Sequence, residues 1–117
     1  MAQLSTHVLD TSLGLPAGNV LVQVNIVRGG QHETLAAATT NAQGRTDSPL
    51  LARERLEPGI YELTFHVGDY YRRAGVTLTD PAFLDQVVIR IGIADAEGHY
   101  HVPLLISPYG YSTYRGT

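Results

Sequence analysis

The sequence predicts an all-β fold, an antiparallel sandwich or barrel. About eight short runs alternate between apolar and polar residues, as strands buried on one face do. Turn-forming residues separate these runs at close spacing, and at most one short stretch suits a helix. Short strands in quick succession with turn signals between them are typical of sandwiches and barrels.

The first half of the chain holds three predicted strands, residues 4–9, 20–28 and 33–40. In the second of these, Val20, Val22, Val24 and Ile26 share one face. Glycines at 29 and 30 join it to the third strand as a hairpin. We expect the 10–19 stretch to be a loop and the Asn-Ala-Gln-Gly sequence at 41–44 to be a tight turn.

The second half is less uniform. Residues 45–57 suit a helical turn or an irregular connection, and residues 69–74 suit either a strand start or a short helix. The Asp-Pro-Ala-Phe sequence at 80–83 predicts a turn. Alternation or β-branched residues predict the remaining strands at residues 60–67, 87–93, 99–107 and 111–115.

Length and composition exclude several classes of site and partner. We expect the 117 residues to form a single domain, 1–117. The chain lacks cysteine, which excludes disulfides, thiolate metal sites and a cysteine nucleophile. A formal charge of −3 with interspersed signs suggests no nucleic-acid partner, and no run is long enough to span a membrane. Without a signal peptide or a peroxisomal tripeptide in view, we expect a cytoplasmic location.

Candidate catalytic groups are histidines and one arginine. His7 lies in the first strand on the face opposite Val8, and Arg45 follows the 41–44 turn. His99 and His101 are two apart in a strand and point the same way. Imidazoles beside a guanidinium suit acid–base chemistry near neutral pH. The alternatives are structural histidines, a solvated arginine, or a zinc site that uses the two tail histidines and His7.

The C-terminal segment is unusually rich in aromatic residues. It carries tyrosines at 100, 109, 111 and 114, together with Arg115 and four serine or threonine side chains. Exposed aromatic residues at this density favour association, so we expect the segment to be held in place and to help form a site.

Four stretches resemble the 5-hydroxyisourate hydrolases, the transthyretin-like enzymes of ureide metabolism. They are LSTHVLDTSLGLPAGNV, TTNAQGRTD, GIYELTF with GDYYRRAG, and HYHVPLLISPYGYSTYRGT. The resemblance covers essentially the whole chain, and its most specific part is the tail, where the family usually ends in Tyr-Arg-Gly-Ser. It implies a transthyretin-like sandwich of two four-stranded antiparallel sheets with one short helix at 69–74.

The same resemblance implies an assembly and a reaction. Family members are homotetramers, dimers of dimers whose active sites line a central channel, so a second subunit would bury the tail tyrosines. The reaction is the hydrolysis of 5-hydroxyisourate to 2-oxo-4-hydroxy-4-carboxy-5-ureidoimidazoline in urate degradation, and it requires no metal or cofactor. The alternative within this fold is a carrier that binds a small aromatic ligand without catalysis.

The family's functional residues transfer by position. The resemblance makes His7, Arg45 and His101 catalytic, with the histidines activating water and Arg45 polarising substrate carbonyls. Thr117 stands where the family usually has serine, which keeps the hydroxyl and adds a methyl group. The full set expected to bind substrate is His7, Arg45, Ser112, Tyr114, Arg115, Gly116 and Thr117.

Overall fold

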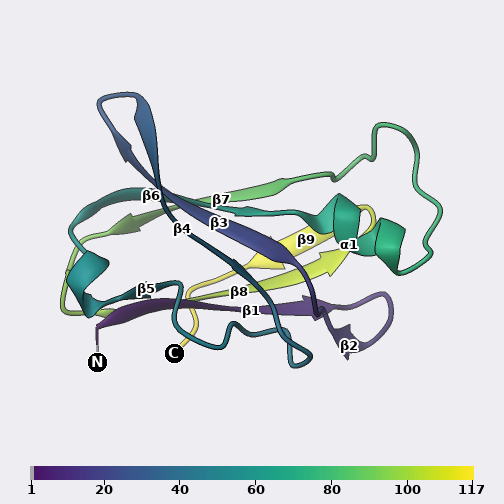
Figure 1. The fold of residues 1–117 in the computed structure, drawn as a ribbon, viewed down its shortest axis with the longest axis horizontal. Helices are drawn as coiled ribbons and strands as arrows, with labels where there is room; N and C mark the ends of the chain where they lie inside the picture. The colour runs from purple at the N-terminus through teal and green to yellow at the C-terminus, as the bar shows by residue number, and fades with distance from the viewer. Residues whose placement is uncertain (1) are drawn as a thin grey trace.

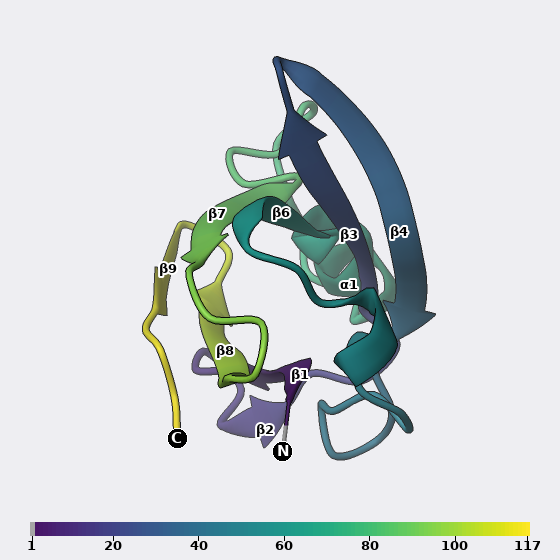
Figure 2. The same ribbon diagram turned by 90° about the vertical axis from the view of Figure 1, so that its left-hand side faces the viewer.

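Two sheets pack face to face in the computed structural model, which describes residues 2–117. One sheet, here the β3–β6 sheet, has the order β4-β3-β6-β7 with every pair antiparallel. Its strands are β3 (Leu21–Arg28), β4 (Gln31–Thr39), β6 (Gly59–Phe65) and β7 (Val87–Ile93). Figures 1 and 2 show it as one layer of the sandwich.

The second sheet, the β1–β8 sheet, has the order β2-β1-β8-β9, and a two-residue strand β5 also pairs with β1. Its strands are β1 (Gln3–Asp10), β2 (Leu15–Pro16), β5 (Leu51–Ala52), β8 (His99–Ser107) and β9 (Gly110–Thr113). β1 and β8 run parallel, which joins the two ends of the chain in the middle of this sheet. The predicted transthyretin-like sandwich with one helix is confirmed, but this sheet is neither four-stranded nor wholly antiparallel.

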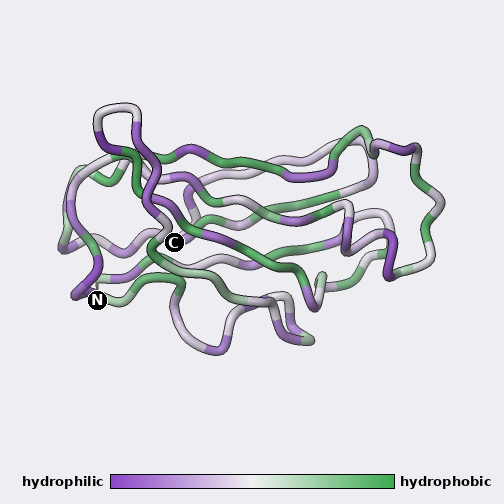
Figure 3. The backbone as a smooth tube through the Cα atoms, turned by 45° about the horizontal axis from the view of Figure 1, so that its top comes forward, coloured by the Kyte–Doolittle hydropathy of each residue, from purple (hydrophilic) through white to green (hydrophobic). Residues whose placement is uncertain are grey.

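The core lies between the sheets and follows the predicted alternation. In β3 the valines at 22 and 24 are fully buried and Ile26 is nearly so. In β6 the side chains of Tyr61, Leu63 and Phe65 are fully buried. Burial alternates residue by residue along β1 as well, so Leu4 and Val8 face the core while His7 does not. Figure 3 shows the same alternation as changes of hydropathy along the backbone.

Several boundaries differ from the prediction. The helix, α1, is Val67–Arg73, two residues earlier than expected, and its first residue is fully buried. The irregular stretch at 45–57 contains β5 and one turn of 3₁₀ helix, η1 (Arg53–Arg55). The last strand ends at Thr113, and only Gly116 bridges back to β8 beyond it.

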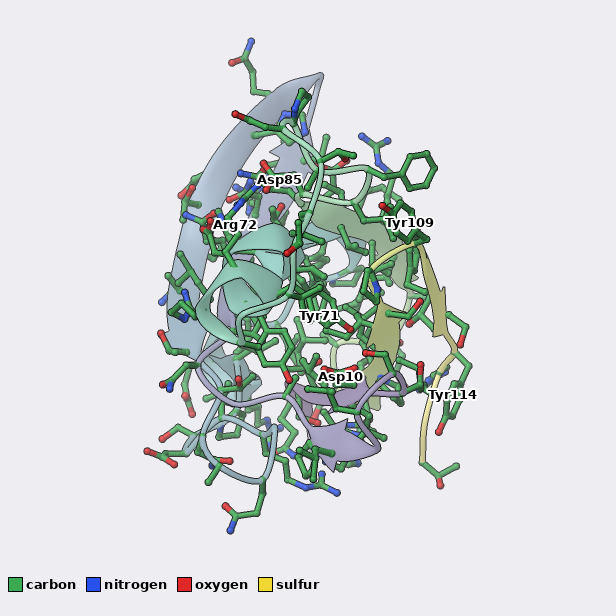
Figure 4. The ribbon with its side chains drawn as sticks, turned by 90° about the vertical axis from the view of Figure 1, so that its right-hand side faces the viewer. Asp10, Tyr71, Arg72, Asp85, Tyr109 and Tyr114 are labelled. Carbon is green, nitrogen blue, oxygen red and sulfur yellow. The ribbon has the colours of Figure 1, made fainter. Side chains whose placement is uncertain are left out.

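A buried carboxylate attaches α1 to the end of β1. The Tyr70 and Tyr71 hydroxyls donate to the two Asp10 oxygens at 2.9 Å each, and Figure 4 shows Tyr71 beside Asp10. Burial would raise the pKa of the Asp10 carboxyl, but hydrogen bonds from Ser12, both tyrosines and the Leu13 N–H lower it overall. Asp10 therefore stays ionised at neutral pH and fixes the strand that carries His7.

None of the helical segments within residues 2–117 is long and apolar enough to cross a membrane.

Candidate active site

The predicted catalytic residues lie in a row across neighbouring segments of the β1–β8 sheet. Arg45 forms an antiparallel bridge with His7 at one edge of β1. On the other edge of β1, Ser5 lies opposite His101 of β8, and Gly116 bridges His101 from the far side. Residues directly opposite each other share a face of a sheet. The structure thus places Arg45, His7, His101 and Gly116 on the outer face, away from the core.

The turn at 41–44 explains how Arg45 reaches this face. The Asn41 side-chain oxygen accepts hydrogen bonds from the backbone N–H groups of Gln43 and Arg45. Gly44 has φ +77°, and a Cβ there would lie 2.3 Å from the Val8 carbonyl oxygen. Only glycine lets the turn approach β1 this closely, so that the Val8 N–H can donate to the Gly44 carbonyl at 2.8 Å.

The charges at the site favour neutral imidazoles. Burial and then the Arg45 charge lower the pKa of His7, partly offset by its hydrogen bond to the Gln43 carbonyl. Burial also lowers the pKa of His101, followed by the charges of Arg45, His7 and His99. Both histidines are therefore unprotonated near neutral pH, the state in which an imidazole can accept a proton.

A polar cleft of about 340 Å³ opens beside this row. Arg45, His99, His101 and Thr117 line it, whereas His7 lies next to it in the row and not among its lining residues. Sequence reasoning did not select several of the residues that complete the lining: Gln3, Ser5, Thr6, Thr46, Asp47, Ser48 and Pro49.

Ser5 is the clearest of the missed residues. Its Oγ lies 2.8 Å from Nδ1 of His101. The signal was present in the sequence, because Ser5 precedes His7 by two positions in a strand and must share its face. Its partner could not be foreseen, since the parallel register between β1 and β8 was unknown.

The tail closes one side of the row. The Gly116 N–H donates to the His101 carbonyl at 2.8 Å, and a Cβ at Gly116 would lie only 2.7 Å from Cδ2 of His101. Arg115 binds the chain itself, with its guanidinium 4.3 Å from the Tyr100 ring centre and a hydrogen bond to the His99 carbonyl. The glycine allows close packing on the His101 imidazole, and the arginine fixes the tail.

Other predicted tail residues lie elsewhere. Tyr114 and Arg115 line a second hollow of about 290 Å³ between β7 and the tail. Ser112 is exposed in β9, opposite Leu105. Tyr109, Tyr111 and Tyr114 are exposed by 64%, 48% and 61%, and Figure 4 shows the first and last of them on the outside of the β9 segment. Within one chain, none of these residues lines the polar cleft, although His101 lines the second hollow together with Tyr114 and Arg115.

The described residues hold no group of three side chains arranged to bind a metal. Nδ1 of His101 contacts Ser5, and Nε2 of His99 lies 3.3 Å from the Gln3 amide nitrogen. The row itself brings two imidazoles and a guanidinium together, an arrangement suited to attack by water on a polarised carbonyl.

Comparisons with known proteins identify the family of this chain. The model of the HIUase/Transthyretin family matches residues 4–116. A 5-hydroxyisourate hydrolase of Pseudomonas aeruginosa is 56% identical over 117 residues, which are 100% of this chain and 93% of that protein. 5-Hydroxyisourate hydrolase 2 of Rhizobium meliloti is 54% identical over 98% of this chain and 96% of its own length.

Solved structures give the same result. The Klebsiella pneumoniae 5-hydroxyisourate hydrolase superposes with TM-score 0.81 at 40% identity, over 99% of this chain and 100% of that one. An (S)-allantoin synthase superposes with TM-score 0.91 at 36% identity; the match covers 98% of this chain but only 43% of that longer one. Transthyretin from Sparus aurata has TM-score 0.88 at 26% identity, over 99% and 97% of the two chains. By family model, sequence and fold, this chain belongs to the HIUase/Transthyretin family.

Proposed function

We propose that this chain is a hydrolase that opens 5-hydroxyisourate at a cyclic amide, giving 2-oxo-4-hydroxy-4-carboxy-5-ureidoimidazoline in urate degradation. The row of Arg45, His7 and His101 on the outer face of the β1–β8 sheet is the observation that carries the proposal. Relatives that share more than half of the sequence are named for this activity. A carrier of an apolar ligand has no need for two neutral imidazoles beside a guanidinium.

The chemistry follows from these three side chains. A neutral imidazole takes a proton from water as the water oxygen adds to the ring carbonyl carbon. The Arg45 guanidinium donates to the carbonyl oxygen and stabilises the negative charge that develops there. When the ring C–N bond breaks, the leaving nitrogen takes a proton back from the imidazolium. His7 lies directly beside Arg45, which supports a role in orienting the water or the substrate.

The tail residues have a proposed role in substrate binding. Thr117 and the Gly116 backbone lie beside His101, which supports contacts to substrate from this chain. Arg115 acts by fixing the tail through Tyr100. Ser112 and Tyr114 are exposed on the last segment of the chain, so we assign their contribution to the site of a neighbouring subunit.

A homotetramer, built as a dimer of dimers, is part of this proposal. The outward-facing tail tyrosines and the free edges of β7 and β9 support it, because such surfaces favour pairing with another copy. Light scattering coupled to size-exclusion chromatography should give a particle mass four times that of one chain. A monomer with full activity would contradict a site shared between subunits. The expected cytoplasmic location stays a prediction that cell fractionation would test.

The deciding assay follows the absorbance of freshly generated 5-hydroxyisourate against its spontaneous decay. His101→Ala and Arg45→Ala should each lower turnover by about 10²–10⁴-fold with the fold retained. Matched controls are His32→Ala and Arg28→Ala, exposed residues whose ion pairs lie on the other sheet. A chain that only binds the substrate would be a carrier, and activity that disappears with a chelator and returns with zinc would support a metal mechanism.

A further inference from the structure

The imidazole of His101 is held on two opposite sides of its ring. On the β1 side, Ser5 Oγ lies 2.8 Å from Nδ1. On the tail side, a Cβ placed at Gly116 would lie 2.7 Å from Cδ2, so the glycine backbone packs against that edge. Nδ1 and Cδ2 are both bonded to Cγ and face opposite ways. With both of these edges covered, Nε2 and Cε1 are left to face away from the sheet. His101 lines both hollows, and the polar cleft is the one that it shares with Ser5 and Arg45.

The two histidines have different hydrogen-bond partners. Nε2 of His7 lies 2.9 Å from the Gln43 carbonyl oxygen, which can only accept. A neutral His7 therefore carries its proton on Nε2. The partner of His101 is a hydroxyl, which can donate or accept, so either tautomer of His101 would satisfy the contact. Only one of them, with the proton on Nδ1, leaves a lone pair on the nitrogen that faces the cleft.

We propose that Ser5 is a positioning residue whose Oγ accepts a hydrogen bond from Nδ1–H of His101, so that Nε2 presents its lone pair to water in the cleft and His101 is the general base. This assignment rests on the proposed hydrolase function. Ser5 is suited to the task because it lies directly opposite His101 on the neighbouring strand, where the sheet register fixes their separation. The groups that face His101 are the Arg45 guanidinium and the imidazoles of His7 and His99. Each of them favours the neutral form of His101.

The kinetic test compares Ser5→Ala, Ser5→Thr and a control. Ser5→Ala should lower kcat on the order of 10–100-fold, the range found when the hydrogen-bond partner that orients a metal-bound histidine is removed, with KM nearly unchanged. Ser5→Thr keeps the hydroxyl and should retain most of kcat. Ser107→Ala removes a serine hydroxyl from β8 itself, where it donates to the Gly110 carbonyl, and should leave kcat unchanged. Equal kcat in Ser5→Ala and the control would overturn the proposal.

A second measurement needs no substrate. In protein with ¹⁵N-labelled histidine, long-range ¹H–¹⁵N spectra report which ring nitrogen carries the proton. We expect Nδ1–H for His101 in the wild type and in Ser5→Thr, and a gain of Nε2–H in Ser5→Ala. Nε2–H in the wild type would overturn the proposal even if Ser5→Ala failed to fold. An inactive wild type with the expected tautomer would instead count against the hydrolase function alone.

Discussion

Replacing Gly116 with alanine tests whether the tail and the imidazole of His101, the proposed general base, form one unit. The new Cβ would lie 2.7 Å from Cδ2 of His101 and 3.2 Å from Cγ of Pro103. Ordinary carbon contacts are about 3.5–4.0 Å, so either the ring or the tail must move by about 1 Å. A displacement of that size at a catalytic group costs on the order of 10²-fold in rate. We therefore expect Gly116→Ala to lower kcat by about 10²-fold in the absorbance assay.

Gly110, at the start of β9, supplies the control. A Cβ at Gly110 would meet nothing closer than the Ser107 hydroxyl at 3.5 Å, an ordinary contact. Gly110→Ala should keep the wild-type kcat. Both variants should keep a cooperative thermal transition, because the overpacking at Gly116 lies on the outer face of the sheet, away from the core. If Gly116→Ala has the kcat of Gly110→Ala, the close packing on His101 has no catalytic consequence and the reasoning fails.

The remaining predictions concern charged groups. Arg45→Gln removes a cation that lowers the pKa of His101, so an NMR titration should give a higher pKa for that imidazole, and an unchanged value would contradict the assignment. Because the histidine pKa values are lowered, wild-type activity should persist below pH 6.5 and fall only as the bases become protonated. Tyr71→Phe removes a hydrogen bond to the Asp10 carboxylate and should lower the free energy of unfolding in urea by about 1.5–3 kcal/mol, whereas Tyr109→Phe, at an exposed ring, should have no effect. The Asp10 contribution should be present above pH about 3.9 and be lost as pH falls through its lowered pKa, so wild type and Tyr71→Phe should converge in acid.

Strands that alternate cleanly were predictable from the sequence. The bounds predicted for residues 87–93 and 99–107 also agree with β7 and β8, where β-branched and other apolar residues supply the buried positions. β5 was not predictable, since its two residues are a strand only through pairing with Gln3 and Leu4 of β1. The parallel pairing of β1 with β8 was equally hidden, because strand periodicity says which face is buried but not which way the neighbour runs.

The candidate site was predictable in its residue types and only partly in its geometry. His7, Arg45 and His101 could be selected from the sequence, and their shared face follows from a register that only the structure reveals. Ser5 shares the face of His7 by its spacing, but it was missed because its partner His101 depends on the register between β1 and β8. Arg115 and Tyr114 were expected to bind substrate, but their position depends on where the tail leaves the sheet after Thr113.

The charged forms of Arg45 and the histidines repel one another, so the site depends on the backbone of the sheet that joins the two chain ends. Arg45 and the histidines disfavour one another's protonated forms, so these side chains do not themselves hold the site together when charged. Backbone hydrogen bonds hold it instead: the Gly44–Val8 contact, the β1–β8 ladder and the Gly116–His101 contact. Ser5 and His101 are 96 residues apart, so the site forms only when the chain ends pair. A variant that loosens the tail should therefore lose activity before it loses the core, because the core lies on the other face of the sheet.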